Sequence, residues 1–122
     1  MKIDYLKVGS DDCPLVRLYD FDSEDAKRLR RTFQALADGS LERVRLEPIE
    51  SVDGTQLTFV RSARDGGMTE TGAKNFEVAL SAEGWLQAAD SVAPFCEGSV
   101  GYQWLAPQSR GLQWLFSKDG SW

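Results

Sequence analysis

The sequence predicts an α+β domain with a mainly antiparallel sheet of about six to seven strands and two helices packed on one face of the sheet. Short runs of alternating apolar and polar residues recur along the chain, which is the pattern of half-buried strands. Two longer segments instead carry apolar residues at helical spacing. The expected strands are joined by short connections, which favours antiparallel pairing. At 122 residues, the chain is expected to form one domain, residues 1–122.

The first third of the chain is expected to fold as two strands and a helix. The strands cover Lys2–Val8 and Leu15–Phe21, and the second has apolar residues on both faces, as an inner strand does. Asp22 and Ser23 can cap the start of the helix, and Gly39 suits a left-handed residue at its end. The helix face expected to be buried consists of Ala26, Leu29, Phe33, Leu36 and Ala37.

The middle third is expected to add three strands, at Leu41–Ile49, Thr55–Arg61 and Asn75–Leu80. The first of them should end near Pro48, which cannot donate a ladder hydrogen bond. Residues 62–74 contain three glycines and show no periodicity, so this segment is expected to be a mobile polar loop.

The last third is expected to form a second helix and a closing hairpin, which completes the order ββαβββαββ. Ser81 can cap the helix, and Pro94 should loosen its last turn. The expected buried stripe consists of Trp85, Ala89, Val92, Ala93 and Cys96. Two apolar runs, Tyr102–Ala106 and Leu112–Phe116, then flank a turn-rich segment, as in a β-hairpin.

The register of this hairpin can be predicted from its aromatic residues. If all of its large inward side chains share one face, Trp104 must oppose Trp114 or Leu112, which requires an odd number of loop residues. The expected inward set is Tyr102, Trp104, Leu112, Trp114 and Phe116. The opposite face would carry Gln103, Leu105, Gln113 and Leu115.

Composition and motifs exclude several classes of function. The net charge of −5 works against nucleic-acid or anionic membrane binding. The chain has no histidine, which excludes His-based catalysis and imidazole metal sites, and it contains no phosphate-binding or hydrolase motif. We therefore expect no enzyme activity and no cofactor. The N-terminus lacks the apolar core of a signal peptide, so we expect a cytoplasmic protein with free thiols at Cys13 and Cys96.

Two charged sets near the first helix each have two interpretations. Carboxylates at the start of the helix could hold a hard cation, but capping and the helix dipole explain them better. Basic residues within the helix could contact phosphate or an acidic partner, although a solvated helix face is favoured. The acidic set is Asp20, Asp22, Glu24 and Asp25, and the basic set is Lys27, Arg28, Arg30 and Arg31.

The leading functional hypothesis is a non-catalytic domain that acts through contact with another protein or with a second copy of itself. It follows from the acidity, the four tryptophans and the absence of catalytic motifs. The residues expected to bind are Gln103, Leu105, Gln113, Leu115 and Trp122, and Trp122 is expected to dock on the domain. The alternative is a small-ligand domain with an aromatic pocket lined by Trp85, Tyr102, Trp104 and Trp114.

Three segments resemble parts of small uncharacterised bacterial proteins. These are GYQWL…LQWLFSKDGSW at the end of the chain, SAEGWLQAADSVAPFCEG before it, and DCPLVRLYDFD near the start. The resemblance implies a compact bacterial α+β domain, and it implies no activity, ligand or catalytic residue. The small, acidic, histidine-free and tryptophan-rich chain is also similar in general style to toxin-neutralising immunity proteins, with which it shares no specific motif.

Overall fold

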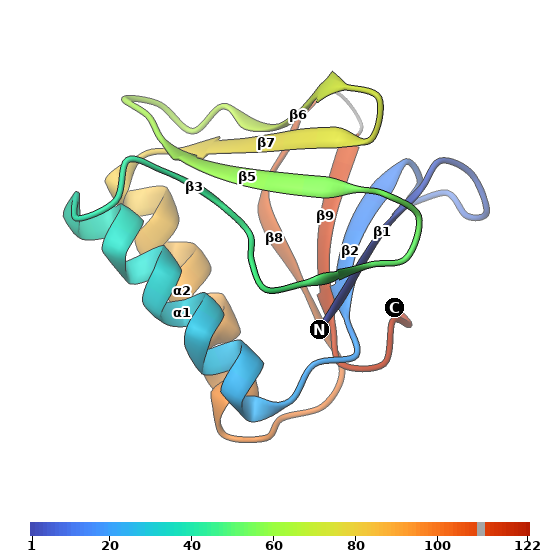
Figure 1. The fold of residues 1–122 in the computed structure, drawn as a ribbon. Coiled ribbons are helices and arrows are strands. Elements are labelled where there is room, and N and C mark those ends of the chain that lie inside the picture. The colour runs from blue at the N-terminus through green and yellow to red at the C-terminus, as the bar shows by residue number, and fades with distance from the viewer. Residues whose placement is uncertain (110–111) are drawn as a thin grey trace.

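The structure is a computed structural model that describes residues 1–109 and 112–122. It is an α+β fold with two helices and two mixed sheets of five and four strands, instead of the single sheet of six to seven strands that the sequence predicts. The strands of the smaller sheet run across those of the larger one, and the two helices lie side by side along the remaining side (Figure 1). The helices therefore close the space between the two sheets.

Each sheet combines segments that are far apart in the sequence. The larger sheet has the order β4-β1-β2-β9-β8, and the smaller sheet has the order β3-β5-β7-β6. The strands of the larger sheet are β4 (Glu50–Ser51), β1 (Lys2–Leu6), β2 (Leu15–Tyr19), β9 (Leu112–Ser117) and β8 (Tyr102–Ser109). Those of the smaller sheet are β3 (Arg43–Arg45), β5 (Gln56–Arg61), β7 (Asn75–Leu80) and β6 (Gly67–Gly72).

Parallel pairing is more common than the short connections predict. In the described part of the chain, β1–β4, β2–β9 and β5–β7 are parallel, and the four other pairs are antiparallel. The pairing of β2 with β9 brings the second and the last strands of the chain together inside the larger sheet. Alternation of apolar residues identifies a strand, but it does not specify such a remote neighbour.

The prediction that residues 62–74 form a mobile polar loop was wrong. It contains β6, an edge strand that pairs with β7 and buries only Gly67 and Met68. This strand pairs with one neighbour and buries only two residues, so its sequence lacks the alternating apolar pattern by which a strand is predicted. The expected strand at Leu41–Ile49 is also reduced, to the three residues of β3.

The first helix, α1 (Ser23–Asp38), follows the sequence closely. Asp22 caps it, and the side chains of Asp22 and Asp25 each accept a hydrogen bond from the other's backbone N–H. Gly39 ends the helix with a φ of 86°, a left-handed conformation that costs glycine little. The buried face consists of Ala26, Leu29, Phe33 and Leu36, as predicted, whereas Ala37, also expected there, is only partly buried.

The second helix, α2 (Ala82–Cys96), begins at the expected cap. The Ser81 hydroxyl accepts a hydrogen bond from the backbone N–H of Gly84. Pro94 lies in the last turn of the helix. Its buried residues are Gly84, Trp85, Ala88, Ala89, Val92, Phe95 and Cys96, and the helix also packs against α1. No helix in the described residues has the length and apolar character needed to cross a membrane.

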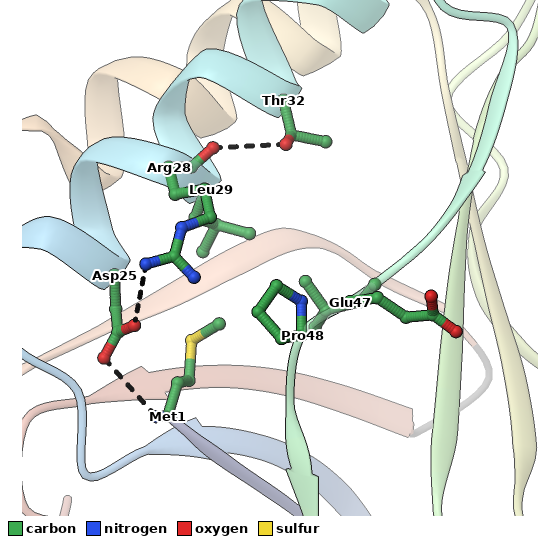
Figure 2. A pocket seen from close by; sticks show the side chains of 8 residues that line it. Met1, Asp25, Arg28, Leu29, Thr32, Glu47 and Pro48 are labelled. Atoms are coloured by element: carbon green, nitrogen blue, oxygen red, sulfur yellow. Dashed lines mark hydrogen bonds and ion pairs between the residues drawn. The ribbon is translucent and has the colours of Figure 1, made fainter.

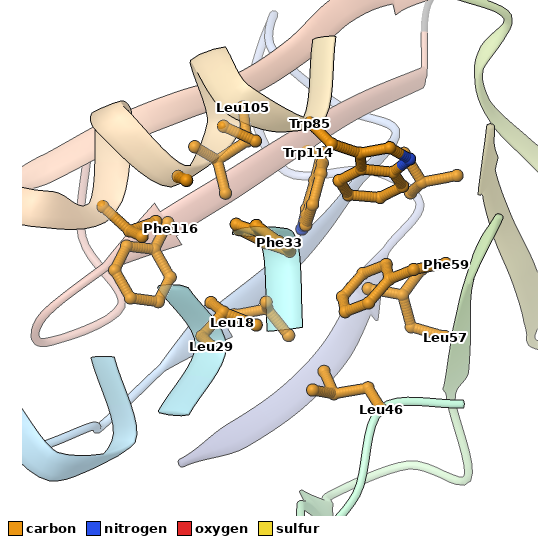
Figure 3. Packing of buried hydrophobic residues seen from close by; sticks show 14 of the residues in the cluster. Leu18, Leu29, Phe33, Leu46, Leu57, Phe59, Trp85, Leu105, Trp114 and Phe116 are labelled. Carbon is orange, nitrogen blue, oxygen red and sulfur yellow. The ribbon is translucent and has the colours of Figure 1, made fainter. Parts of the chain in front are cut away.

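Four aromatic side chains meet at the centre of the core (Figure 3). Phe33 comes from α1, Phe59 from β5, Trp85 from α2 and Trp114 from β9, and their ring centroids lie 5.3 to 6.4 Å apart. Each helix and each sheet thus contributes a ring to the same cluster. Such aromatic pairs add stability beyond the area that they bury.

Candidate functional site

The closing hairpin has a different register from the predicted one. Trp104 opposes Leu115, and Leu105 opposes Trp114, so Tyr102 and Trp104 lie on the opposite face of the sheet from Trp114. The register also shifts between Leu105 and Ser109. The prediction of one shared aromatic face was therefore wrong. Trp85, Phe33 and Phe59 already fill the core beside Trp114, and the smaller Leu105 occupies the inward position.

This register removes the expected binding surface around Leu105 and Leu115. The two leucines are on opposite faces of the sheet, and both are buried, with 2% and 0% of their surface exposed. Gln103 is exposed, and its side-chain amide donates to the backbone carbonyl of Trp104 at 3.3 Å. Gln113 is half-buried and opposes Leu15 in the parallel pair of β2 and β9. The structure thus does not bring these four residues together on one surface.

Trp122 docks on the molecule, as expected. It is half-buried, and its indole Nε1 donates to Oδ2 of Asp12 at 2.9 Å, in the segment between β1 and β2. The preceding residues are held by Arg17, whose Nη1 donates to the carbonyl of Gly120 at 2.8 Å. These contacts place the C-terminal segment against the outer face of the larger sheet, where Leu15 and Leu115 are buried.

An ion pair lies on this outer face. Nε and Nη2 of Arg17 donate to the two oxygens of Asp4, at 2.7 and 2.9 Å, in a two-bond arrangement. The guanidinium also stacks over the ring of Tyr19, with its Cζ 4.1 Å from the ring centroid. Hydrogen bonding to Asp4 raises the pKa of the Arg17 guanidinium above its ordinary value. Each of the three guanidinium nitrogens of Arg17 thus donates a hydrogen bond within the domain. The bond from Nη1 to the carbonyl of Gly120 holds the C-terminal segment in place.

The predicted aromatic pocket is not formed by the four residues expected to line it. Trp85 and Trp114 are buried in the core, with 0% and 2% of their surface exposed. Tyr102 and Trp104 pack against each other elsewhere, with ring centroids 6.2 Å apart. Trp104 lines a hollow beside α2 whose lining does not include Trp85, Tyr102 or Trp114.

A narrow cavity between α1 and the segment after β3 is too small for a ligand (Figure 2). Met1, Leu29 and Pro48 line it, and its volume is about 20 Å³, which is room for one water molecule. The polar groups at its rim pair with one another, since Asp25 lies 3.4 Å from the amino group of Met1 and 3.6 Å from Arg28. This cavity is a small packing gap in the domain.

A larger hollow lies between α2 and the edge strand β8. Its volume is about 300 Å³, and it is open to solvent. Trp104 of β8, a half-buried residue, lines one side, and residues of α2 line the other. The residues that line it are Asp65, Leu80, Gly84, Gln87, Ala88, Ser91 and Trp104. We name this feature the α2–β8 hollow.

Asp65 is held firmly at one end of the α2–β8 hollow. Its Oδ1 accepts hydrogen bonds from both the backbone N–H and the hydroxyl of Ser81, each at 2.8 Å. These bonds lower the pKa of Asp65, so its side chain is a carboxylate at neutral pH. Gly84 allows this position, because a Cβ on residue 84 would overlap Oδ1 of Asp65. Oδ2 of Asp65 has no hydrogen-bond partner within the described residues.

The surface around the hollow is acidic. No lysine or arginine occurs in the sequence between Lys74 and Arg110, whereas that stretch contains four carboxylates. Glu83 and Asp90 lie one helical turn on either side of Gln87 and therefore flank the hollow. Neither forms an ion pair with any cation of the described chain. Glu83 and Asp90 thus carry negative charge near Gln87 that no cation among the described residues neutralises.

The hollow was only partly visible in the sequence. The absence of cations between Lys74 and Arg110 can be read directly, and Trp104 was among the residues considered for a pocket. Asp65 could not be linked to them, since it belongs to the segment expected to be a mobile loop. Only the pairing of β6 with β7 and the bonds of Asp65 to Ser81 bring it to the start of α2.

Most residues of the charged sets near α1 have the structural roles favoured from the sequence, except Arg30, which is half-buried with its Nε buried and without a partner among the described residues. Asp22 and Asp25 form the capping box, while Asp20 pairs with Lys2. Lys27 and Arg28 pair with acidic residues three positions earlier on the same helix. Within residues 1–109 and 112–122, no group of three or more Cys, Asp or Glu side chains has the geometry of a metal site, and Cys13 and Cys96 are free.

Comparisons of the chain with models of protein families, with curated proteins and with solved structures find no match.

Proposed function

We propose that this protein is a non-catalytic domain that binds another protein through the surface around the α2–β8 hollow. The observation that carries the proposal is the hollow itself, which lies beside Glu83 and Asp90, two carboxylates that pair with no described cation. Gln87, an exposed residue of α2, lines the hollow and makes it accessible from solvent.

The shape of the hollow favours a protein over a small ligand. Small-ligand sites bury most of the ligand surface and are lined mainly by apolar side chains. The α2–β8 hollow is open, and Asp65, Gln87 and Ser91 make a large part of its lining polar. An anchoring side chain of a larger partner would fill it, while the rest of the partner covered the surface around it.

Charge favours a different protein over a second copy of this chain. In a twofold dimer centred on this surface, the same acidic patch would face itself, with Glu83 and Asp90 of each copy brought together. A partner with positive charge would instead meet a complementary surface. Sedimentation equilibrium at micromolar concentration would show a monomer if this argument holds, and a dimer would assign the surface to self-association.

The test is selection of binding sequences from a library of random linear peptides against the wild-type protein. Peptides that use the proposed surface should lose binding to Gln87→Arg and Ser91→Arg variants that keep the wild-type melting temperature, since both residues line the hollow. Val8→Arg and Val52→Arg are controls, since both residues are exposed but do not line the hollow. A set of selected peptides that is insensitive to Gln87→Arg and Ser91→Arg would reject this surface.

A further inference from the structure

The edges of the two sheets differ in how well they are protected against another strand. An edge strand presents unpaired backbone N–H and C=O groups, and short length, charged side chains or irregular pairing keep other chains from adding to it. In the described chain, β4 and β3 have two and three residues, and β6 contains Glu70 and a shift of register. β8 has eight residues, and its segment Tyr102–Leu105 contains no charged side chain. The larger sheet thus ends at an edge that lacks these protections along this segment.

The pairing of β8 with β9 determines which backbone groups of β8 face outwards. Just before β8, the carbonyl of Gly101 accepts a hydrogen bond from the backbone N–H of Lys118 at 2.9 Å, so Gly101 bonds on the β9 side. Because neighbouring residues of a strand direct their backbone groups to opposite sides, the N–H and C=O groups of Tyr102 and Trp104 point away from β9. The carbonyl of Trp104 is accordingly free to accept from the side-chain amide of Gln103 at 3.3 Å. Although β6 lies close to β8, no ladder joins the two strands in the described chain.

The α2–β8 hollow lies along this open edge. Figure 1 shows β8 on the side of the larger sheet that faces the helices, and Trp104 lines the hollow opposite Gln87 and Ser91 of α2. The side chain of Trp104 is on the other face of the sheet from the buried Leu105, so β8 borders the hollow with its backbone edge. A residue of an added strand that opposed Leu105 would share its face and point towards α2. The hollow, with a volume of about 300 Å³, has room for such a side chain.

We propose that the partner protein adds an extended segment to β8 as a further strand of the larger sheet. This inference rests on the proposed function, because it names the way in which the partner binds. The backbone groups of Tyr102 and Trp104 pair with those of the segment, and a side chain of the segment that points towards α2 enters the hollow. In this mode of recognition, backbone hydrogen bonds supply affinity and the pocket for alternate side chains supplies specificity.

Hydrogen exchange of the free protein, followed by NMR, tests whether the edge is open. The backbone N–H of Trp104 should exchange at least about tenfold faster than those of Gln103 and Leu105, which bond to β9. Equal protection at the three positions would show that another part of the chain covers the edge, and it would overturn the inference.

Peptides from the random library that bind this surface are the probes of the bound state. A bound peptide should slow exchange of the Trp104 N–H by at least about tenfold. Methylation of the peptide's backbone nitrogens, one at a time, should weaken binding about tenfold at every second residue and little at the residues between. This alternation is expected because only every second N–H group of a strand faces the same neighbour.

Tyr102→Pro removes one outward N–H group from β8. Proline is tolerated on the open side of an edge strand, so the ladder with β9 should persist. Tyr102→Ala is the matched control, because it removes the same side chain but keeps the N–H. At equal melting temperatures, the selected peptides should bind Tyr102→Pro about tenfold more weakly than Tyr102→Ala, and equal binding would overturn the inference. If Tyr102→Pro unfolds the protein, the series of methylated peptides still decides the outcome.

The outcome can be separated from that of the proposed function. Peptides that lose binding to Gln87→Arg and Ser91→Arg, but show no alternation and leave the Trp104 N–H unprotected, would keep the protein-binding surface and reject strand addition. Peptides that protect this N–H but are unaffected by the two arginine variants would keep strand addition and reject the hollow as the binding surface. A dimer of the free protein with a protected Trp104 N–H would assign the edge to a second copy of the chain and overturn the inference. A library that yields no binding peptide would reject the proposed function and this inference with it.

Discussion

At the scale of single residues, the two buried core tryptophans differ in one hydrogen bond. Trp85 donates from Nε1 to the carbonyl of Val60 at 3.0 Å, whereas Nε1 of Trp114 is buried without a partner among the described residues. The two side chains are otherwise similarly buried, in one aromatic cluster. Replacement by phenylalanine therefore removes a comparable volume at both positions but a hydrogen bond at only one.

We expect Trp85→Phe to destabilise the protein by at least about 1 kcal/mol more than Trp114→Phe. The added cost comes from the lost bond and from the carbonyl of Val60 that is left unpaired. Urea denaturation of both variants, monitored by circular dichroism, measures the two free energies of unfolding. A larger loss for Trp114→Phe would show that Nε1 of Trp114 does have a partner.

Gly84 is a second residue at this scale, because its close approach to Asp65 explains why glycine occupies the position. An alanine there would ordinarily favour the helix by about 1 kcal/mol. Here its Cβ would overlap Oδ1 of Asp65 and lie 3.1 Å from Cβ of Leu80, so we expect Gly84→Ala to lower the melting temperature. In an Asp65→Ala background the main overlap is gone, and the same substitution should be neutral or stabilising. Equal effects in both backgrounds would exclude Asp65 as the reason for glycine at this position.

At the scale of elements, periodicity and capping predicted the helices well but not the sheets. Asp22, Gly39 and Ser81 act within a few residues of their own positions, so the sequence alone identifies both helix starts and the end of α1. The strand β6 and the hairpin register depend instead on what lies across the fold. Leu105 is inward because Trp114 and its neighbours already fill the core, and no local pattern around Leu105 indicates this.

The C-terminal segment is the element whose docking can be tested most directly. Trp122 is only half-buried, so Trp122→Ala should cost about 1–2 kcal/mol, less than the loss of a core aromatic residue. Asp12→Ala removes the acceptor of its indole N–H, and a double-mutant cycle should give a coupling of about 1 kcal/mol. Val8→Ala is the control, with a change within about 0.5 kcal/mol. Zero coupling would contradict the bond between Trp122 and Asp12.

At the scale of the whole molecule, the aromatic cluster joins both sheets and both helices into one core. No local change in the core should therefore leave one sheet folded and the other unfolded. This arrangement also explains why the fold class was easier to predict than the topology. The amounts of helix and strand follow from local patterns, whereas the division into two mixed sheets follows from which segments the shared core brings together.

The titratable groups of the whole molecule predict how its stability depends on pH. Hydrogen bonds lower the pKa of several aspartates, most directly those from backbone N–H groups to Asp22 and Asp65. A carboxylate with a lowered pKa in the folded state contributes stability above its unfolded pKa of about 4, and that stability is lost as the pH falls through the folded value. The aspartates with a lowered pKa are Asp22, Asp38, Asp53, Asp65 and Asp119.

We therefore expect a plateau of stability between about pH 5 and pH 8, because the chain has no histidine to titrate in that range. Below the plateau, the free energy of unfolding should fall as the aspartates are protonated. Above about pH 10, burial of Tyr5 and Tyr19, which raises their pKa values, makes ionisation favour the unfolded state. Urea denaturation from about pH 3 to about pH 11 tests this profile. Asp22→Asn keeps an N-cap but binds no proton, so its acid decline should be shallower, and a decline that began between about pH 6 and pH 7 would contradict the assignment.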